Sequence, residues 1–298
     1  WTTIYTAFGA ALATAPQTTS QWVPTACNQW QFHDIDLSAY DGQLVLIHFE
    51  GESHFGNDLF IDNINVVNTG VRLALKVLLE GPYDANTQLM SDALRTAGLV
   101  PASEPYTALG FLHAGGGGGE SRQAGALTGA GNNAIVDWVL VELRDNATGQ
   151  SVVATRSALL QRDGDVVAED GSSPIAFEAA PGNYKVAVRH RNHLGAMTNG
   201  SIAMSATPTS LDLSLPATAT HGTEARKNIG ARAALWAGNC VRDGTVSALK
   251  YIGAGNDRDP MLVRIGGLLP NNTVTGYWSE DVNMDGVVKY TGTLNDRD

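Results

Sequence analysis

The chain has 298 residues, of which 43% are hydrophobic and 16% charged, and its formal net charge is −11. A globular chain of this length can hold two or three domains. The acidic charge argues against nucleic acid as a partner, and no apolar run of about 18 residues is present to insert into a membrane. Thirty-three glycines among many Thr, Ser, Asn and Val residues indicate a mainly β fold.

Residues 1–69 are predicted to form part of a jelly-roll domain. Segments 44–50 and 58–66 are apolar and strand-like, and the turn-rich residues 51–57 join them. Together with residues 36–42, this pair resembles the closing half of the MAM-like, choice-of-anchor jelly rolls of secreted bacterial proteins. The resemblance implies that the earlier strands of such a domain come from other protein.

Three aromatic residues in this part are candidates for stacking on a sugar ring: Trp22, Trp30 and Tyr40. Jelly-roll folds often present such a face, so surface glycans are one expected kind of partner. Packing in a core or at a strand edge is the alternative explanation for the same residues.

Residues 70–217 are predicted to form a β-sandwich similar to prealbumin-like or immunoglobulin-like stalk modules. A short helix is expected over 87–97, and Asp163-Gly164 has the residues of a hairpin turn. The glycine run 115–119 lacks the lysine and the helix of a phosphate-binding loop, so we expect a mobile loop there. Alternating apolar residues predict strands at 71–79, 134–143, 151–161, 175–178, 183–190 and 210–215.

Residues 218–298 are predicted to form a third, small domain that starts with a short helix over 224–236. A near-repeat follows, in which 236–259 returns as 278–298 with the same Trp, Lys-Tyr and Asn-Asp-Arg-Asp. The second copy contains Asp-Val-Asn-Met-Asp-Gly over 281–286, where three oxygen-bearing side chains alternate before a glycine. This is the spacing of a calcium loop, and the paired loops resemble a dockerin domain.

Ca²⁺ is therefore the expected ligand of the second copy. The twelfth loop position, where an EF-hand has a bidentate carboxylate, is Gly292, so other residues must supply oxygens. Asx turns without any metal would explain the same residues. The predicted ligands are Asp281, Asn283, Asp285, the carbonyl of Val287, Asn295, Asp296 and Asp298, with weaker candidates in the first copy at Asn239, Asp243, Asn256, Asp257 and Asp259.

The sequence contains no Gly-x-Ser-x-Gly, His-Glu-x-x-His or Cys-x-x-Cys motif. His190 and His193 have a spacing that suits a metal on a turn, but Arg189 and Arg191 would repel a cation. We expect ordinary hydrogen bonds at a polar strand end. The chain is therefore predicted not to be an enzyme, with no catalytic residues.

Cys27 and Cys240 could form one long-range disulfide or remain two unpaired buried thiols, and the sequence leaves both open. The stretch from Val71 through the Asn-Asp-Arg-Asp repeats resembles a module that recurs in haemagglutinin-like surface proteins of the bacterial type IX secretion system. The resemblance implies a secreted or cell-surface location.

The expected function is that of a non-catalytic structural or adhesive protein that calcium stabilises. It would be part of a larger surface protein or a subunit of an extracellular filament, with neighbouring domains or identical subunits as partners at both termini. A carbohydrate-binding accessory module of a larger secreted enzyme is the alternative.

Overall fold

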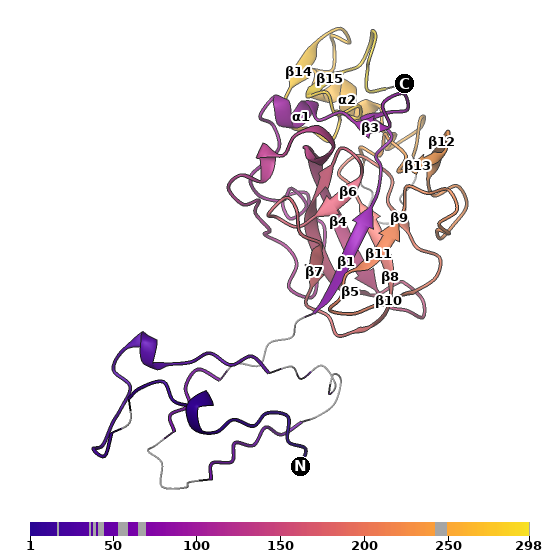
Figure 1. Cartoon of the computed structure of the whole chain (residues 1–298). Coiled ribbons are helices and arrows are strands. Elements are labelled where there is room, and N and C mark those ends of the chain that lie inside the picture. Colours follow the sequence, from indigo (N-terminus) through magenta and orange to yellow (C-terminus); the bar gives the residue numbers. More distant parts are fainter. Residues whose placement is uncertain are drawn as a thin grey trace. The chain divides into compact units, whose positions relative to one another are not determined.

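The computed structural model describes residues 1–298 except 17, 36, 38–39, 41–44, 53–58, 65–69, 242–248 and 298. The chain divides into two compact units, Trp1–Val67 and Asn68–Asp298 (Figure 1). The second unit contains both the predicted sandwich range and the predicted third domain. The boundary near residue 217 therefore stays a prediction.

The described residues of the first unit contain two single-turn 3-10 helices, η1 at Gly9–Ala11 and η2 at Cys27–Gln29, and no β-strand. In the predicted strands 44–50 and 58–66, the described residues 45–50 and 59–64 belong to no strand. Residues 44, 58, 65 and 66 lie outside the described residues, as do residues 53–57 of the predicted turn. Their apolar side chains are exposed, with Leu46 at 83% and Leu59 at 56%. A strand needs a hydrogen-bonded neighbour to be stable, and the apolar pattern alone does not provide one.

The second unit is built around a nine-stranded sheet, which confirms the mainly β prediction. Its strands follow the order β10-β8-β4-β5-β6-β1-β11, with β7 also paired to β1 and β9 to β8. Every pair is antiparallel except β1 with β11. The strands are β1 Val71–Lys76, β4 Ile135–Arg144, β5 Val152–Gln161, β6 Asp165–Val167, β7 Ile175–Phe177, β8 Gly182–Arg189, β9 Ala196–Met197, β10 Ile202–Met204 and β11 Thr209–Asp212.

The six strands predicted from alternation in this range are all present, with ends that differ from the prediction by at most three residues. The turn between β5 and β6 lies at the predicted Asp163-Gly164, where Gly164 adopts a φ of 94° that favours glycine. The central strand β4 is buried along nearly its whole length, because neighbouring segments cover both of its faces. Its Trp138 is fully buried and faces Leu159 of β5 across the ladder.

Two predicted helices are wrong or shorter than expected. Residues 87–97 contain only α1 at Ala93–Thr96, because Leu89–Met90 is strand β3, paired with β2 at Tyr83–Asp84. Residues 224–236 form a hairpin of β12 at Lys227–Ile229 and β13 at Arg232–Ala234. Pairing between neighbouring segments has overridden the local helix propensity of both stretches.

The glycine run 115–119 packs closely on β5 instead of forming a detached loop. A Cβ atom at Gly117 would lie 2.2 Å from Thr155 Oγ1, and one at Gly115 would lie 2.7 Å from the Cβ of Ala154. The Thr155 N–H also donates to the carbonyl of Ala114 over 2.9 Å. Glycine is therefore required for close backbone approach, and the mobile loop expected from composition is replaced by a packed segment.

The C-terminal elements lie together at one end of the sheet, near α1 and β3 (Figure 1). They are α2 at Asp259–Arg264 and the hairpin of β14 at Thr273–Thr275 with β15 at Val287–Lys289. A small apolar cluster of its own holds them, formed by Met261, Ile265, Val282 and Val288. No helix among the described residues has the length and hydropathy to cross a bilayer.

The core assignment predicts that Val186→Asp unfolds the second unit. Val186 is fully buried in β8, and an unpaired carboxylate there would cost more than the stability of a typical domain can tolerate. Val153→Asp is the matched control, because Val153 lies in β5 but is 40% exposed. Thermal unfolding followed by circular dichroism should show no cooperative transition for Val186→Asp and a transition close to wild type for Val153→Asp. A stable Val186→Asp variant would contradict the strand assignment.

Candidate functional site

The sequence repeat is also a repeat of hydrogen bonds. Asp296 accepts the N–H groups of Val282 and Lys289 over 2.7 Å each, one on each carboxylate oxygen. Asp257 accepts the N–H groups of Val241 and Lys250 in the same way over 2.8 Å each. In both copies the aspartate N–H also donates to the carbonyl of that lysine over 2.9 Å. Each aspartate therefore joins the start of its loop to the Lys-Tyr segment.

The residues on either side of these aspartates repeat their roles as well. Asn256 and Asn295 donate through their side-chain amides to the carbonyls of Gly253 and Gly292, respectively. Each asparagine also accepts the N–H of the arginine two residues later, at 3.1 Å in the first copy and 3.0 Å in the second. Arg258 lies over the ring of Tyr251 and Arg297 over the ring of Tyr290. The Asn-Asp-Arg motif is thus a turn whose three side chains all have structural partners.

The predicted calcium loop folds tightly around Asp281. The two carboxylate oxygens of Asp281 accept the N–H groups of Asp285 and Gly286 over 3.1 and 2.9 Å. Asn283 Oδ1 accepts the same Asp285 N–H over 2.9 Å, and Asp285 Oδ1 accepts the N–H of Val287. Gly286 has a φ of 88°, which the sequence pattern requires of this position. The loop therefore places Asp281, Asn283 and Asp285 on one turn.

The electrostatics of this loop disfavour its own charges. Asp281 is fully buried, and desolvation, together with repulsion from Asp296 and Asp285, raises its pKa to about 7 despite the opposing charge of Arg191. Desolvation also raises the pKa of Asp296 to about 6, against three backbone N–H donors and with repulsion from Asp285. Asp281 and Asp296 are buried carboxylates with raised pKa values, and they lie near Asp285. A positive charge at this site would stabilise their ionised forms.

The side chains predicted to bind calcium differ in their positions and hydrogen bonds. Asp281, Asn283 and Asp285 share one turn, whereas Asn295 and Asp296 satisfy backbone groups around it. In the described part of the chain, no group of three or more His, Cys, Asp or Glu side chains has the geometry to hold a metal ion. In the first copy, Asn239 and Asp257 are buried, Asn256 donates to Asp259, and Asp243 lies outside the described residues, as does Asp298 in the second copy.

A buried ion pair joins the sheet to these loops. Asp137 of β4 and Arg191, just after β8, are 0% and 1% exposed, and the Arg191 Nε atom lies 2.9 Å from Asp137 Oδ2. Arg191 also donates to the carbonyl of Trp278, and its guanidinium lies 4.3 Å from the centre of the Tyr277 ring. The Tyr277 hydroxyl donates to Asp137 Oδ1 over 2.6 Å. One charge pair thus joins strand β4, the segment after β8 and the start of the second repeat.

Two histidines extend the pair into a chain of hydrogen bonds. The Gly81 N–H donates to His193 Nε2 over 3.1 Å, which places the proton of a neutral His193 on Nδ1. His193 Nδ1 lies 3.0 Å from His190 Nδ1, and His190 Nε2 lies 3.2 Å from Asp137 Oδ2. His193 Nδ1 also lies 2.7 Å from Asn192 Oδ1, so its proton is directed to Asn192 as well as to His190. His190 donates from Nε2 to Asp137.

The protonation states follow from burial and from the ion pair. Desolvation opposes both charges, yet attraction to Arg191 and the hydrogen bonds from His190 and Tyr277 lower the pKa of Asp137 to about 2. The pKa of Arg191 is raised by Asp137 against its own desolvation. Desolvation lowers the pKa of His190, and the pKa of His193 falls well below its usual value for the same reason, with repulsion from His190 and Arg191 added. Both histidines are neutral at pH 7.

The sequence interpretation placed His190 and His193 at a polar strand end, whereas the structure buries them almost completely. It also missed Asp137, Tyr277 and Asn192, whose side-chain amide donates to the carbonyl of Asp281 over 2.5 Å. A signal was present, because Asp137 is an acidic residue inside an otherwise apolar strand. Its partner could not be identified from a position more than fifty residues away in the chain.

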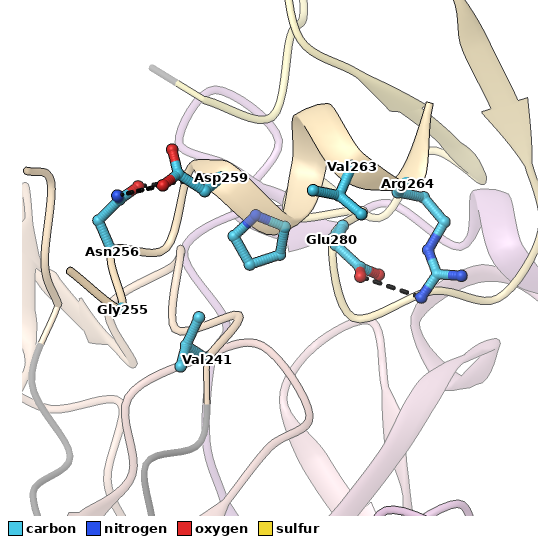
Figure 2. A pocket seen from close by; sticks show the side chains of 8 residues that line it. Val241, Gly255, Asn256, Asp259, Val263, Arg264 and Glu280 are labelled. Carbon is cyan, nitrogen blue, oxygen red and sulfur yellow. Dashed lines mark hydrogen bonds and ion pairs between the residues drawn. The ribbon is translucent and has the colours of Figure 1, made fainter. Parts of the chain in front are cut away.

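A hollow of about 520 Å³ lies beside the first copy of the repeat (Figure 2). Asn256 and Asp259 from the Asn-Asp-Arg-Asp turn line one side, and Val263 and Arg264 of α2 with Glu280 line the other. Arg264 Nη2 lies 3.0 Å from Glu280 Oε1.

The aromatic candidates of the first unit have separate surroundings. Trp22 packs edge-to-face on Phe60 with ring centres 6.0 Å apart, Trp30 is 42% exposed and Tyr40 is partly buried. Glycan stacking on them stays a prediction. Cys27 is exposed and Cys240 partly buried, both as free thiols.

Comparisons with protein-family profiles, with curated proteins and with solved structures found no match to this chain.

Removing one partner of the buried ion pair should be strongly destabilising. Arg191→Met leaves Asp137 charged without its partner and should lower the free energy of unfolding by about 3–5 kcal/mol. Arg189→Met is the matched control, because Arg189 is more exposed and pairs with Glu142 over 3.5 Å, and its loss should cost less than about 1 kcal/mol. Chemical denaturation measures both. The double variant Asp137→Asn, Arg191→Met should recover part of the loss, and a single variant as stable as the control would contradict the assignment.

The buried histidines should make stability fall in mild acid. Because their folded pKa values lie below the unfolded value of about 6.5, the unfolded chain binds more protons, and stability present above pH 6.5 is lost as the pH falls toward the folded pKa. His193→Gln keeps an acceptor for Gly81 and removes one titration. Between pH 7 and 5 the wild type should lose roughly 1–2 kcal/mol more than this variant. His221→Gln, at an exposed position, should follow the wild type, and parallel curves for all three would contradict the buried neutral state.

Proposed function

We propose that this chain is a non-catalytic structural or adhesive protein that acts outside the cell, and that Ca²⁺ stabilises its second loop repeat. The observation that carries the proposal is the burial of Asp281 and Asp296 beside Asp285, where desolvation and mutual repulsion raise the pKa of the first two. A divalent cation would offset that repulsion. Asp281, Asn283, Asp285 and the Val287 carbonyl would bind it, and Ca²⁺ prefers such oxygen ligands.

The surroundings of the loop support a structural role for the ion. The Asp281 carbonyl accepts from Asn192, and Arg191 contacts the Trp278 carbonyl, so the loop is attached to the end of β8. An ion that orders the loop would therefore also strengthen its attachment to the sheet. Extracellular modules keep such sites loaded with dissociation constants of about 10⁻⁴ to 10⁻³ M, because calcium is abundant outside cells.

The non-catalytic part of the proposal is supported by the burial of the histidine chain. Asp137, His190 and His193 form a sequence of hydrogen bonds that would suit proton transfer, but each is at most 2% exposed. A substrate cannot contact a group at that depth. The chain of bonds instead supports a structural junction between the sheet and the repeats.

In finer terms, we propose a prealbumin-like or immunoglobulin-like β-sandwich for the sheet and a dockerin-like pair of loops at the end. The first unit supports neighbouring domains or identical subunits as partners, because its large apolar side chains lie in water. Those exposed by 80% or more in that unit are Trp1, Phe8, Phe32 and Leu46. Apolar surface of this kind is normally covered by other protein.

Calcium should raise the melting temperature of the full chain, and excess chelator should lower it. At a concentration about tenfold above the dissociation constant, the ion would contribute roughly 1.4 kcal/mol. Asp285→Asn should abolish the difference between the two conditions. Asp145→Asn is the matched control, because Asp145 also accepts backbone N–H groups in a turn but lies outside the repeats. Identical melts of the wild type in calcium and in chelator would overturn the calcium proposal.

A further inference from the structure

The hollow beside α2 has a wall that is mixed in chemistry. Val241, Pro260 and Val263 present aliphatic surface, whereas Asp259, Arg264 and Glu280 bring charge. Figure 2 shows the Arg264 guanidinium turned toward Glu280. Two carboxylates and one guanidinium leave this wall with one net negative charge.

Glu280 is the residue that points to a ligand. It is only 9% exposed, and its Oε1 atom pairs with Arg264. Its Oε2 atom has no hydrogen-bond partner among the described residues. A buried charged oxygen without a donor costs more than an unpaired neutral group, so a donor from outside would be stabilised there.

Arg264 is not free to satisfy both oxygens of Glu280. Its guanidinium lies 4.1 Å from the centre of the Trp278 ring, a contact that fixes its plane. Glu280 therefore offers one oxygen, which suits a point charge with rotatable donors better than the two-pronged fork of a second arginine. Ca²⁺ would need six to eight oxygens, whereas much of this wall is aliphatic.

From these observations we propose that the hollow binds the lysine side chain of a partner polypeptide. The methylene stem would lie against Val241, Pro260 and Val263. A rotation of the Glu280 carboxylate would turn the buried Oε2 atom toward the hollow, where the ammonium would donate to it and neutralise the remaining charge. This inference names a partner chemistry for the adhesive role and rests on that role. Its test does not involve calcium, so either proposal can fail alone.

The experiment uses the full chain labelled with ¹⁵N, with Nα-acetyl-lysine methylamide as the probe at millimolar concentration. The amides of Val241, Gly255 and Val263 should shift with a common dissociation constant. Nα-acetyl-norleucine methylamide has a similar stem without the charge, and it should bind at least about tenfold more weakly, because a charge-assisted hydrogen bond is lost.

Variants locate the effect on the protein. Glu280→Gln should weaken lysine binding at least about tenfold. Glu142→Gln is the control, since Glu142 is also a nearly buried glutamate with arginine partners but lies in β4. Val263→Trp fills the hollow from a position 71% exposed on α2, so it tests the location even if Glu280→Gln does not fold. Equal binding of both probes, or lysine binding that survives Glu280→Gln or Val263→Trp, would overturn the proposal, as would no binding of lysine at all.

Discussion

The ion pair of Asp137 with Arg191 is the constraint on which the second unit depends. Burying two charges costs several kcal/mol each, and the cost is recovered only when each remaining oxygen and N–H finds a partner. Asp137 meets this requirement through Arg191, His190, Tyr277 and the Trp138 N–H. Three of these partners come from distant parts of the chain, so the pair can form only when the sheet and the second repeat are docked together.

The same charges shape the properties of the calcium loop. Arg191 attracts Asp281 and lowers its pKa, yet desolvation outweighs this attraction and the carboxyl still has a raised pKa. Arg191 is already neutralised by Asp137, which limits what it can offer to a second carboxylate. Arg191 therefore contacts the loop but does not balance the charge of its carboxylates. This unbalanced negative charge is the physical reason for proposing a cation there.

The two repeats share one set of backbone hydrogen bonds but differ in the loop and in the helix that accompany it. Asp257 and Asp296 make the same backbone bonds, so each copy is held by its own aspartate. In the second copy Asp281 accepts two loop N–H groups, whereas the side-chain oxygen of its counterpart Asn239 has no hydrogen-bond partner among the described residues, which exclude 242–248. The first copy contributes α2 instead, and Met261 and Ile265 from this helix pack against Val282 and Val288 of the second.

Sequence alone determined six of the nine strands of the sheet and the turn at Gly164, because period-two alternation and glycine dihedrals are local properties. It also determined the repeat and the convergence of Asp281, Asn283 and Asp285 on one loop. It did not determine that 89–90 and 227–234 pair as strands, since pairing depends on neighbours, nor that the glycine run packs on β5. Only the tertiary structure decided that Asp137, Arg191 and the two histidines meet in one dry junction. Burial and partner identity are properties of the whole fold, and no local pattern of residues encodes them.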